Sequence, residues 1–272
     1  MIKTVLLVCL ATVAVGKVLD NSELRDFVEG VEKLKRGEGI TEDVGNRIVG
    51  GNTAAIGQFP YQASVRTTAN WHFCGGFIAN SRWVISAAHC TINSTPGNTI
   101  VVLGAHSRTT GGNSFSLSTV INHPNFDDFS LAFDVSVLQT ATTIAFNNLI
   151  QPIALGSEHI GGGITAVVSG WGMTSSPGSL ANELQFVHVQ TWTNTACRNI
   201  LGSDREWWVF DHKICAGGVQ GQGVCSADSG GPLVIGNYAI GIVCWAIPCA
   251  VGYPDGYDRV SSHRAWIQQH IE

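Results

Sequence analysis

Apolar and polar residues along the chain form short runs that predict strands rather than helices. Residues 62–66 alternate between polar and apolar, and Asn80 and Ser81 form a turn signal between two apolar runs. From Ile48 onward, helical spacing is clear only at residues 261–271, where a serine is the expected N-cap. Strands at this spacing, without helices between them, predict β-barrels or β-sandwiches. The predicted strands are residues 62–66, 75–79, 83–86, 99–103, 135–138, 165–168, 183–189, 233–235 and 239–243.

The first residues have the pattern of a signal peptide. Lys3 precedes an apolar run over residues 5–15, and the small residue Gly16 follows it. The run is too short to span a membrane, so we predict that residues 1–16, Cys9 included, are removed during secretion. The mature protein is therefore expected outside the cell.

Residues 17–47 differ from the rest of the chain, since they contain eight acidic residues and no cysteine. The spacing of apolar residues from Leu24 to Leu34 predicts a short amphipathic helix. Arg47 directly precedes the apolar pair Ile48-Val49. We interpret residues 17–47 as a propeptide that a trypsin-like protease cuts after Arg47. By itself, an arginine at the end of a loop would explain Arg47 equally well.

Composition and charge exclude several classes of protein. The net charge is −5 with no basic cluster, which argues against a nucleic-acid partner. Glycine is abundant (32 residues) and charged residues are few (13%), as suits short strands joined by many turns. No CxxC pair occurs, which argues against zinc. The cysteines outside the signal peptide are sufficient for three disulfides, with one thiol left over.

Three segments carry candidate catalytic residues. Ser229 lies in a Gly-rich turn before an apolar run, and a serine hydroxyl needs an adjacent base to become a nucleophile. His89 follows a predicted strand and precedes a cysteine, and Asp134 directly precedes another predicted strand. A buried carboxylate is costly unless it is paired, and orienting a histidine N–H provides such a pairing. Asp127 and Asp128 compete with Asp134 for this role, but we expect them to be solvated.

These segments together resemble the chymotrypsin-like serine proteases, with the histidine, aspartate and serine in that order along the chain. The resemblance covers residues 48–272 and implies an all-β fold of two perpendicular six-stranded antiparallel β-barrels with a C-terminal helix. It identifies the chain as a serine endopeptidase that works through an acyl-enzyme. The motifs that carry it are Ile48-Val49-Gly50-Gly51, Ala87-Ala88-His89-Cys90, Asp134-Val135-Ser136-Val137-Leu138, Ser169-Gly170-Trp171-Gly172 and Asp228-Ser229-Gly230-Gly231-Pro232.

The resemblance implies a role for further residues. The backbone N–H groups of Ala227 and Ser229 would form the oxyanion hole. After cleavage, the new α-amino group of Ile48 would pair with Asp228 and order this loop, so that the uncut chain is an inactive zymogen. The implied disulfides are Cys74–Cys90, Cys197–Cys215 and Cys225–Cys249, which leaves Cys244 unpaired.

The residues expected around the substrate pocket differ from those of trypsin-like relatives. Gly223 stands where trypsin-like enzymes have an aspartate, and Asp255 stands on the opposite wall, where most relatives have a glycine. This combination resembles the broad-specificity collagenolytic enzymes of crabs and some insects, the brachyurins. We expect chymotrypsin-like specificity with a secondary basic activity. The predicted pocket residues are Gly223, Val224, Cys244, Trp245, Ala246 and Asp255.

Three departures from the family pattern bear on activity. Ala227 replaces the glycine of the oxyanion hole, and its Cβ restricts the backbone. Ala246, followed by Ile247-Pro248, replaces a glycine at the pocket entrance. Cys244 replaces a serine beside the buried aspartate, where a thiol is a poorer donor, although a small buried residue would also explain it. These changes keep open the alternative of a weakened homologue that acts as a binding or regulatory protein. A secreted toxin or anticoagulant is a third hypothesis.

Other features complete the expectations. We expect no metal, because residues 105–118, where relatives hold calcium, contain no acidic residue. Asn93 begins a glycosylation sequon. His123 and His188 are expected to be structural or at the surface. The mature region has a single lysine, Lys213, which suits survival in a trypsin-rich fluid such as the gut lumen. We expect a digestive monomer without a cofactor, with protein or peptide substrates, an activating protease and protein protease inhibitors as partners.

Overall fold

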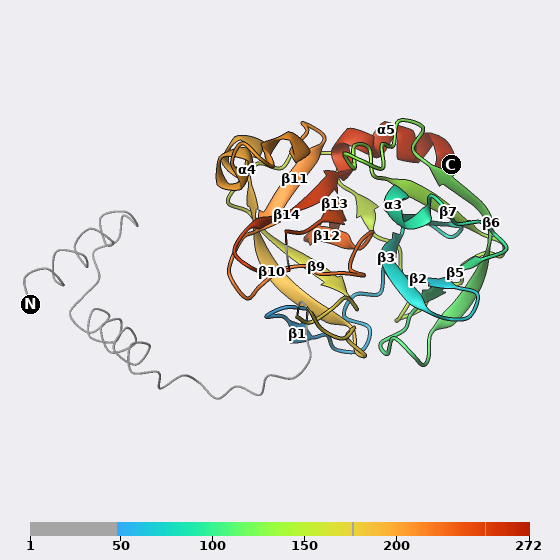
Figure 1. The fold of residues 1–272 in the computed structure, drawn as a ribbon. Coiled ribbons are helices and arrows are strands. Elements are labelled where there is room, and N and C mark those ends of the chain that lie inside the picture. Colours follow the sequence, from blue (N-terminus) through green and yellow to red (C-terminus); the bar gives the residue numbers. More distant parts are fainter. Residues whose placement is uncertain (1–47, 176, 248) are drawn as a thin grey trace, which may run out of the picture. The chain divides into compact units, whose positions relative to one another are not determined.

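The computed structural model describes residues 48–175, 177–247 and 249–272. The expected signal peptide and propeptide, Arg47 included, lie outside the described residues, as does Pro248. In the described part the chain forms two β-barrels side by side, with helix α5 beside them (Figure 1).

The first barrel closes in the order β2-β3-β4-β7-β6-β5, and every neighbouring pair is antiparallel. Ala63 and Val65 on β2 point into its core with Val101 and Leu103. Successive side chains on a strand point to opposite faces, so Arg66 lies on the outer face of the barrel, yet it too is buried. The strands are β2 (Gln62–Thr67), β3 (His72–Ile78), β4 (Trp83–Ser86), β5 (Thr99–Leu103), β6 (Asn113–Asn122) and β7 (Ser136–Thr140).

The second barrel runs β10-β11-β14-β13-β12-β9, and an antiparallel pairing of β9 with β10 closes it. Two short strands extend it: β1 pairs antiparallel with β10, and β8 pairs parallel with β13. Ile48 belongs to the core of this barrel. The strands are β1 (Asn52–Thr53), β8 (Ala154–Leu155), β9 (Thr165–Gly170), β10 (Gln185–Trp192), β11 (Lys213–Gly217), β12 (Pro232–Ile235), β13 (Tyr238–Trp245) and β14 (Pro254–Arg259).

Helix α5 (Val260–Ile271) joins the two barrels, since it contacts β7 of the first and β13 of the second. Its Val260 and Ile267 share one apolar cluster with Phe77 and Ile242, which come from different barrels. The predicted pair of six-stranded barrels with a C-terminal helix is thus confirmed. The predicted serine N-cap is wrong: the N-cap is Arg259 without a side-chain hydrogen bond, because β14 runs directly into the helix.

The expectation that only the C-terminus is helical is also wrong. The described residues include α3 (Ala88–Thr91), α4 (Asn194–Leu201) and the 3-10 turn η1 (Glu206–Trp208). The N-cap of helix α4 is Thr193, whose hydroxyl accepts a hydrogen bond from the N–H of Ala196 at 3.1 Å. In the part of the chain that the structure describes, no helix is both long and apolar enough to cross a membrane.

Candidate active site

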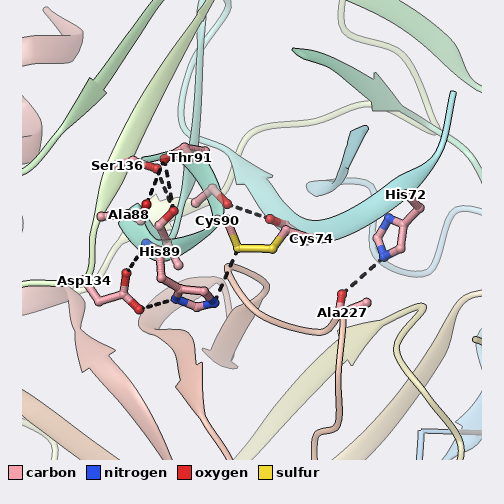
Figure 2. The surroundings of a disulfide bond; sticks show 12 residues. His72, Cys74, Ala88, His89, Cys90, Thr91, Asp134, Ser136 and Ala227 are labelled. Atoms are coloured by element: carbon pink, nitrogen blue, oxygen red, sulfur yellow. Dashed lines mark hydrogen bonds and ion pairs between the residues drawn. A yellow bond between two sulfur atoms is a disulfide. The ribbon is translucent and has the colours of Figure 1, made fainter. Parts of the chain in front are cut away.

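The side chains of His89 and Asp134 are in direct contact (Figure 2). His89 Nδ1 lies 2.6 Å from Asp134 Oδ2, and the backbone N–H of His89 donates to Asp134 Oδ1 at 2.7 Å. The carboxylate is fully buried and can only accept here, so Nδ1 carries the proton. In the neutral ring Nε2 is then an acceptor, as a general base requires.

A disulfide holds the short helix that carries His89. Cys90 follows His89 and is bonded to Cys74 on β3 (Figure 2). Gly75, the next residue on β3, donates its N–H to the carbonyl of Ser229 at 2.8 Å. Helix α3, which carries His89, and the loop that carries Ser229 are therefore both bonded to strand β3.

Asp134 is positioned by a stack of rings around the preceding residue, Phe133. The Phe133 ring lies between His123 and His212, with ring centroids 5.0 and 4.4 Å away. The backbone N–H of Phe133 donates to His212 Nε2 at 3.2 Å. Phe133 has a φ of 54°, which is uncommon for a non-glycine residue, so this packing holds the backbone in a strained conformation.

The loop with Ser229 lies directly against β3. A Cβ on Gly230 would lie 2.6 Å from the carbonyl oxygen of Gly75, so only glycine fits there. Ala227 has a φ of 73°, and its carbonyl lies 3.2 Å from His72 Nε2 (Figure 2). Among the described residues, no hydrogen bond joins Ser229 Oγ to His89, and the N–H groups of Ala227 and Ser229 have no acceptor.

Asp228 is a buried carboxylate with backbone partners. Its oxygens accept from the N–H groups of Gly172 at 2.8 Å and Cys225 at 3.0 Å. A Cβ on Gly170 would lie 2.2 Å from its Oδ1, which explains the glycine there. Burial raises the pKa of Asp228 to about 7. A positive partner would bring this pKa down and stabilise the carboxylate.

A cavity of about 320 Å³ lies beside Ser229. Four of the predicted pocket residues line it with Ser229: Val224, Cys244, Trp245 and Ala246. The other two predicted residues, Gly223 and Asp255, are not among its lining residues. The disulfide Cys225–Cys249 lies at the same cavity, and Cys197–Cys215 is the third disulfide, so the pairs match those that the resemblance implies.

Asp255 lies directly behind the pocket. Its Oδ2 accepts from the N–H of Val224 at 3.0 Å, and a Cβ on Gly223 would lie 2.7 Å from the same oxygen. Asp255 is 1% exposed, and its Oδ1 has no hydrogen-bond partner among the described residues. Burial raises its pKa to about 8, with Asp228 contributing, so the group is protonated at neutral pH.

Sequence reasoning missed a buried cluster behind Asp134. Lys213 Nζ donates to Asp258 Oδ2 at 2.5 Å and to Cys244 Sγ at 3.1 Å, and His263 Nε2 lies 2.9 Å from Asp258 Oδ1. The carboxylates of Asp134 and Asp258 and the sulfur of Cys244 lie within 4.8 Å of one another. Burial raises the pKa of Cys244 well above its usual value, so it is a neutral thiol. The signal in the sequence that could have indicated this cluster is Lys213, a lone lysine in an otherwise apolar strand.

The remaining predicted residues lie at the surface. Asn93 is exposed, as are Asp127 and His188. Asp127 bonds to the nearby Ser130 rather than to His89. Asp134 is therefore the carboxylate that contacts His89.

The sequence matches the family described as Trypsin over residues 48–267. The chain belongs to the trypsin family of serine proteases. It is 38% identical over 237 residues to Trypsin-1 of Astacus astacus, covering 81% of this chain and 98% of that protein. It is 34% identical over 235 residues to Trypsin delta of Drosophila erecta, covering 85% of this chain and 90% of that protein.

Proposed function

We propose that this trypsin-family protease hydrolyses peptide bonds through Ser229, His89 and Asp134. The contact of His89 Nδ1 with Asp134, which leaves Nε2 as an acceptor, carries this proposal. Ser229 Oγ attacks the scissile carbonyl and His89 takes its proton, then gives it to the leaving amine as the peptide bond breaks. Water, deprotonated by His89, then hydrolyses the acyl-enzyme and restores the Ser229 hydroxyl. The free N–H groups of Ala227 and Ser229 stabilise the oxyanion.

The proposed specificity is chymotrypsin-like or broadly collagenase-like, with a secondary basic activity. The cavity beside Ser229 is lined by Val224 and Ala246, and Gly223 provides no carboxylate. Asp255, buried behind Val224 and protonated at neutral pH, becomes negatively charged only as the pH rises past its pKa of about 8, so the secondary basic activity is proposed to increase at alkaline pH. Both relatives compared above carry the name trypsin. We therefore expect this chain to differ from them in substrate specificity.

The protein is proposed to be a secreted, monomeric zymogen of digestive fluid that is activated after Arg47. Ile48 is fully buried in the core of the second barrel, and Asp228 is a fully buried carboxylate whose described partners are backbone N–H groups, so a new α-amino group at Ile48 is proposed as its positive partner. The single lysine of residues 48–272, Lys213, is fully buried and so inaccessible to trypsin in the folded protein. Protein substrates follow from the family; the activating trypsin-like protease, protein inhibitors and glycosylation of Asn93 belong to the proposal.

A catalytically weakened homologue that binds or regulates is the second candidate. The observation that favours it is the φ of 73° at Ala227, where a Cβ strains the backbone of the proposed oxyanion hole. The intact pairing of His89 with Asp134 favours the active enzyme.

The deciding experiment is titration of Ser229 with a fluorophosphonate probe. The purified full chain is cleaved with trypsin and an N-terminus at Ile48 is verified. We expect one label per molecule after cleavage and none in Ser229→Ala, with labelling strongly reduced in His89→Ala. Arg47→Gln is the matched control for activation and should stay unlabelled. Correct cleavage without labelling would favour the binding protein, and labelling of Arg47→Gln would contradict the zymogen.

A further inference from the structure

A buried cation lies on the outer face of the first barrel, with no counter-ion in the part of the chain that the structure describes. Arg66 on β2 is 1% exposed. Its Nε donates to Ser64 Oγ at 2.7 Å and its Nη1 to Asn70 Oδ1 at 2.9 Å, whereas Nη2 is buried without a partner. The protein thus fixes the guanidinium through Nε and Nη1, while Nη2 has no acceptor among the described residues.

The surroundings of Arg66 are positive. Among the described residues no carboxylate pairs with it, and burial lowers its pKa, with a further contribution from the charge of Arg108. Residues 105–118, which include the loop over this face, contain no acidic residue. A buried charge without a partner is costly, so the site favours an anion.

A hollow of about 330 Å³ lies over this guanidinium. Besides Arg66, its lining includes the exposed hydroxyl residues Thr68, Thr110 and Ser114. Thr109 also lines the hollow, but its hydroxyl already donates to Asn182 Oδ1 at 3.1 Å. Hydroxyl groups can donate hydrogen bonds to an oxyanion, and the Arg66 guanidinium supplies the opposite charge. The hollow therefore combines a fixed charge at its base with neutral donors around its rim.

The guanidinium also begins a chain of hydrogen bonds that reaches the Ser229 loop. Arg66 Nε can only donate to Ser64 Oγ, so the Ser64 hydroxyl proton is free to donate to His72 Nδ1, 2.7 Å away. His72 Nε2 then donates to the Ala227 carbonyl at 3.2 Å. Burial lowers the pKa of His72 to about 4, which keeps the ring neutral as this direction requires.

We propose that this hollow is a binding site for a small oxyanion, such as phosphate or sulfate, with the Arg66 guanidinium as its cation. The anion neutralises the buried guanidinium, and the rim hydroxyls complete its hydrogen bonds. The site does not depend on the proposed function, because neither Ser229 nor cleavage after Arg47 takes part in it.

The test measures thermal unfolding of the full, uncut chain in increasing phosphate, with chloride adjusted to keep ionic strength constant. At about ten times its Kd, phosphate should raise the Tm of the natural protein by about 3–5 °C. Arg66→Met should fold, since it removes an unpaired buried charge, and should lose this rise. Arg82→Met is the matched control: it removes a cation elsewhere on the first barrel and should keep the full effect.

Phosphate also stabilises proteins generally by exclusion from their surface, so the difference between Arg66→Met and the other two proteins is decisive. An equal Tm rise in all three would overturn the proposal. Broadening of the phosphorus NMR line of phosphate by the natural protein provides a check that needs no variant. No broadening at millimolar phosphate would also overturn it.

Discussion

Replacing Lys213 by methionine tests the buried cluster behind Asp134. Lys213 and Asp258 lie opposite each other on β11 and β14, both fully buried, with Nζ 2.5 Å from Oδ2. Lys213→Met leaves the Asp258 carboxylate buried with only His263 as its ionisable hydrogen-bond partner. We expect a loss of about 3–5 kcal/mol in the free energy of unfolding, the usual cost of removing one partner of a buried pair.

The double variant Lys213→Met/Asp258→Asn shows how much of this loss comes from leaving the Asp258 charge unpaired. It removes both charges, so it should recover part of the loss, with a coupling energy of about 2 kcal/mol or more. Urea unfolding of the full chain at pH 7 measures Lys213→Met, Asp258→Asn and the double variant. Asp211→Asn is the matched control, because Asp211 is 99% exposed in its pair with Arg198 and should cost below about 1 kcal/mol.

The pH dependence provides a second measure of the same pair. Burial alone would raise the pKa of Asp258, but Lys213 and His263 lower it to about 2. A lowered folded-state pKa contributes stability above the unfolded-state value, and this stability is lost as the pH falls from about 4 to 2. Lys213→Met should lose less stability across this window. Strictly additive effects of the two substitutions, with an unchanged acid profile, would refute the argument.

Three further predictions concern the pocket and the Ser229 loop. Because the pKa of Asp255 is about 8, its carboxylate forms as the pH rises. The ratio of kcat/KM for arginine substrates to kcat/KM for phenylalanine substrates should therefore increase between pH 6.5 and 9. An equal increase in Asp255→Gly would contradict this. Ala227→Gly should relieve a φ of 73° and raise the free energy of unfolding by about 1 kcal/mol, measured in urea, and a loss of stability would show that the backbone is unstrained. Cys244→Ser supplies a stronger donor beside Asp134 and should keep or raise kcat/KM, normalised by Ser229 titration, whereas a tenfold loss would show that the sulfur itself is needed.

The strands that the sequence predicted are those with alternating or continuous apolar residues. Residues 83–86 and 99–103 form β4 and β5 with the predicted bounds. Strands β6, β11 and β14 were missed. Strand β14 has the sequence PDGYDR, which contains three charged residues and no apolar alternation, yet all six residues are buried. Its Asp258 is compensated by Lys213 on β11, a partner that is 45 residues away in the chain.

Local sequence signals also failed to predict where two of the helices lie or begin. Thr193 was a readable N-cap for α4, but eight residues with two buried side chains leave little periodic signal. The start of α5 was misplaced because a serine is a good N-cap in isolation, whereas here the geometry of β14 determines where the helix begins.

From the sequence alone, strand periodicity predicted β-barrels or β-sandwiches, and the family motifs implied the two barrels and the candidate residues Ser229, His89 and Asp134, because periodicity and short motifs are local properties of the chain. Only the tertiary structure decided that Asp134 contacts His89, that Asp255 lies behind the pocket and that Lys213 pairs with Asp258. It also placed Arg66 in a buried position where none of the described residues is a counter-ion. The physical reason is that burial and pairing of charges depend on which strands meet, and a charged residue has the same local pattern whether its partner is water or a distant side chain.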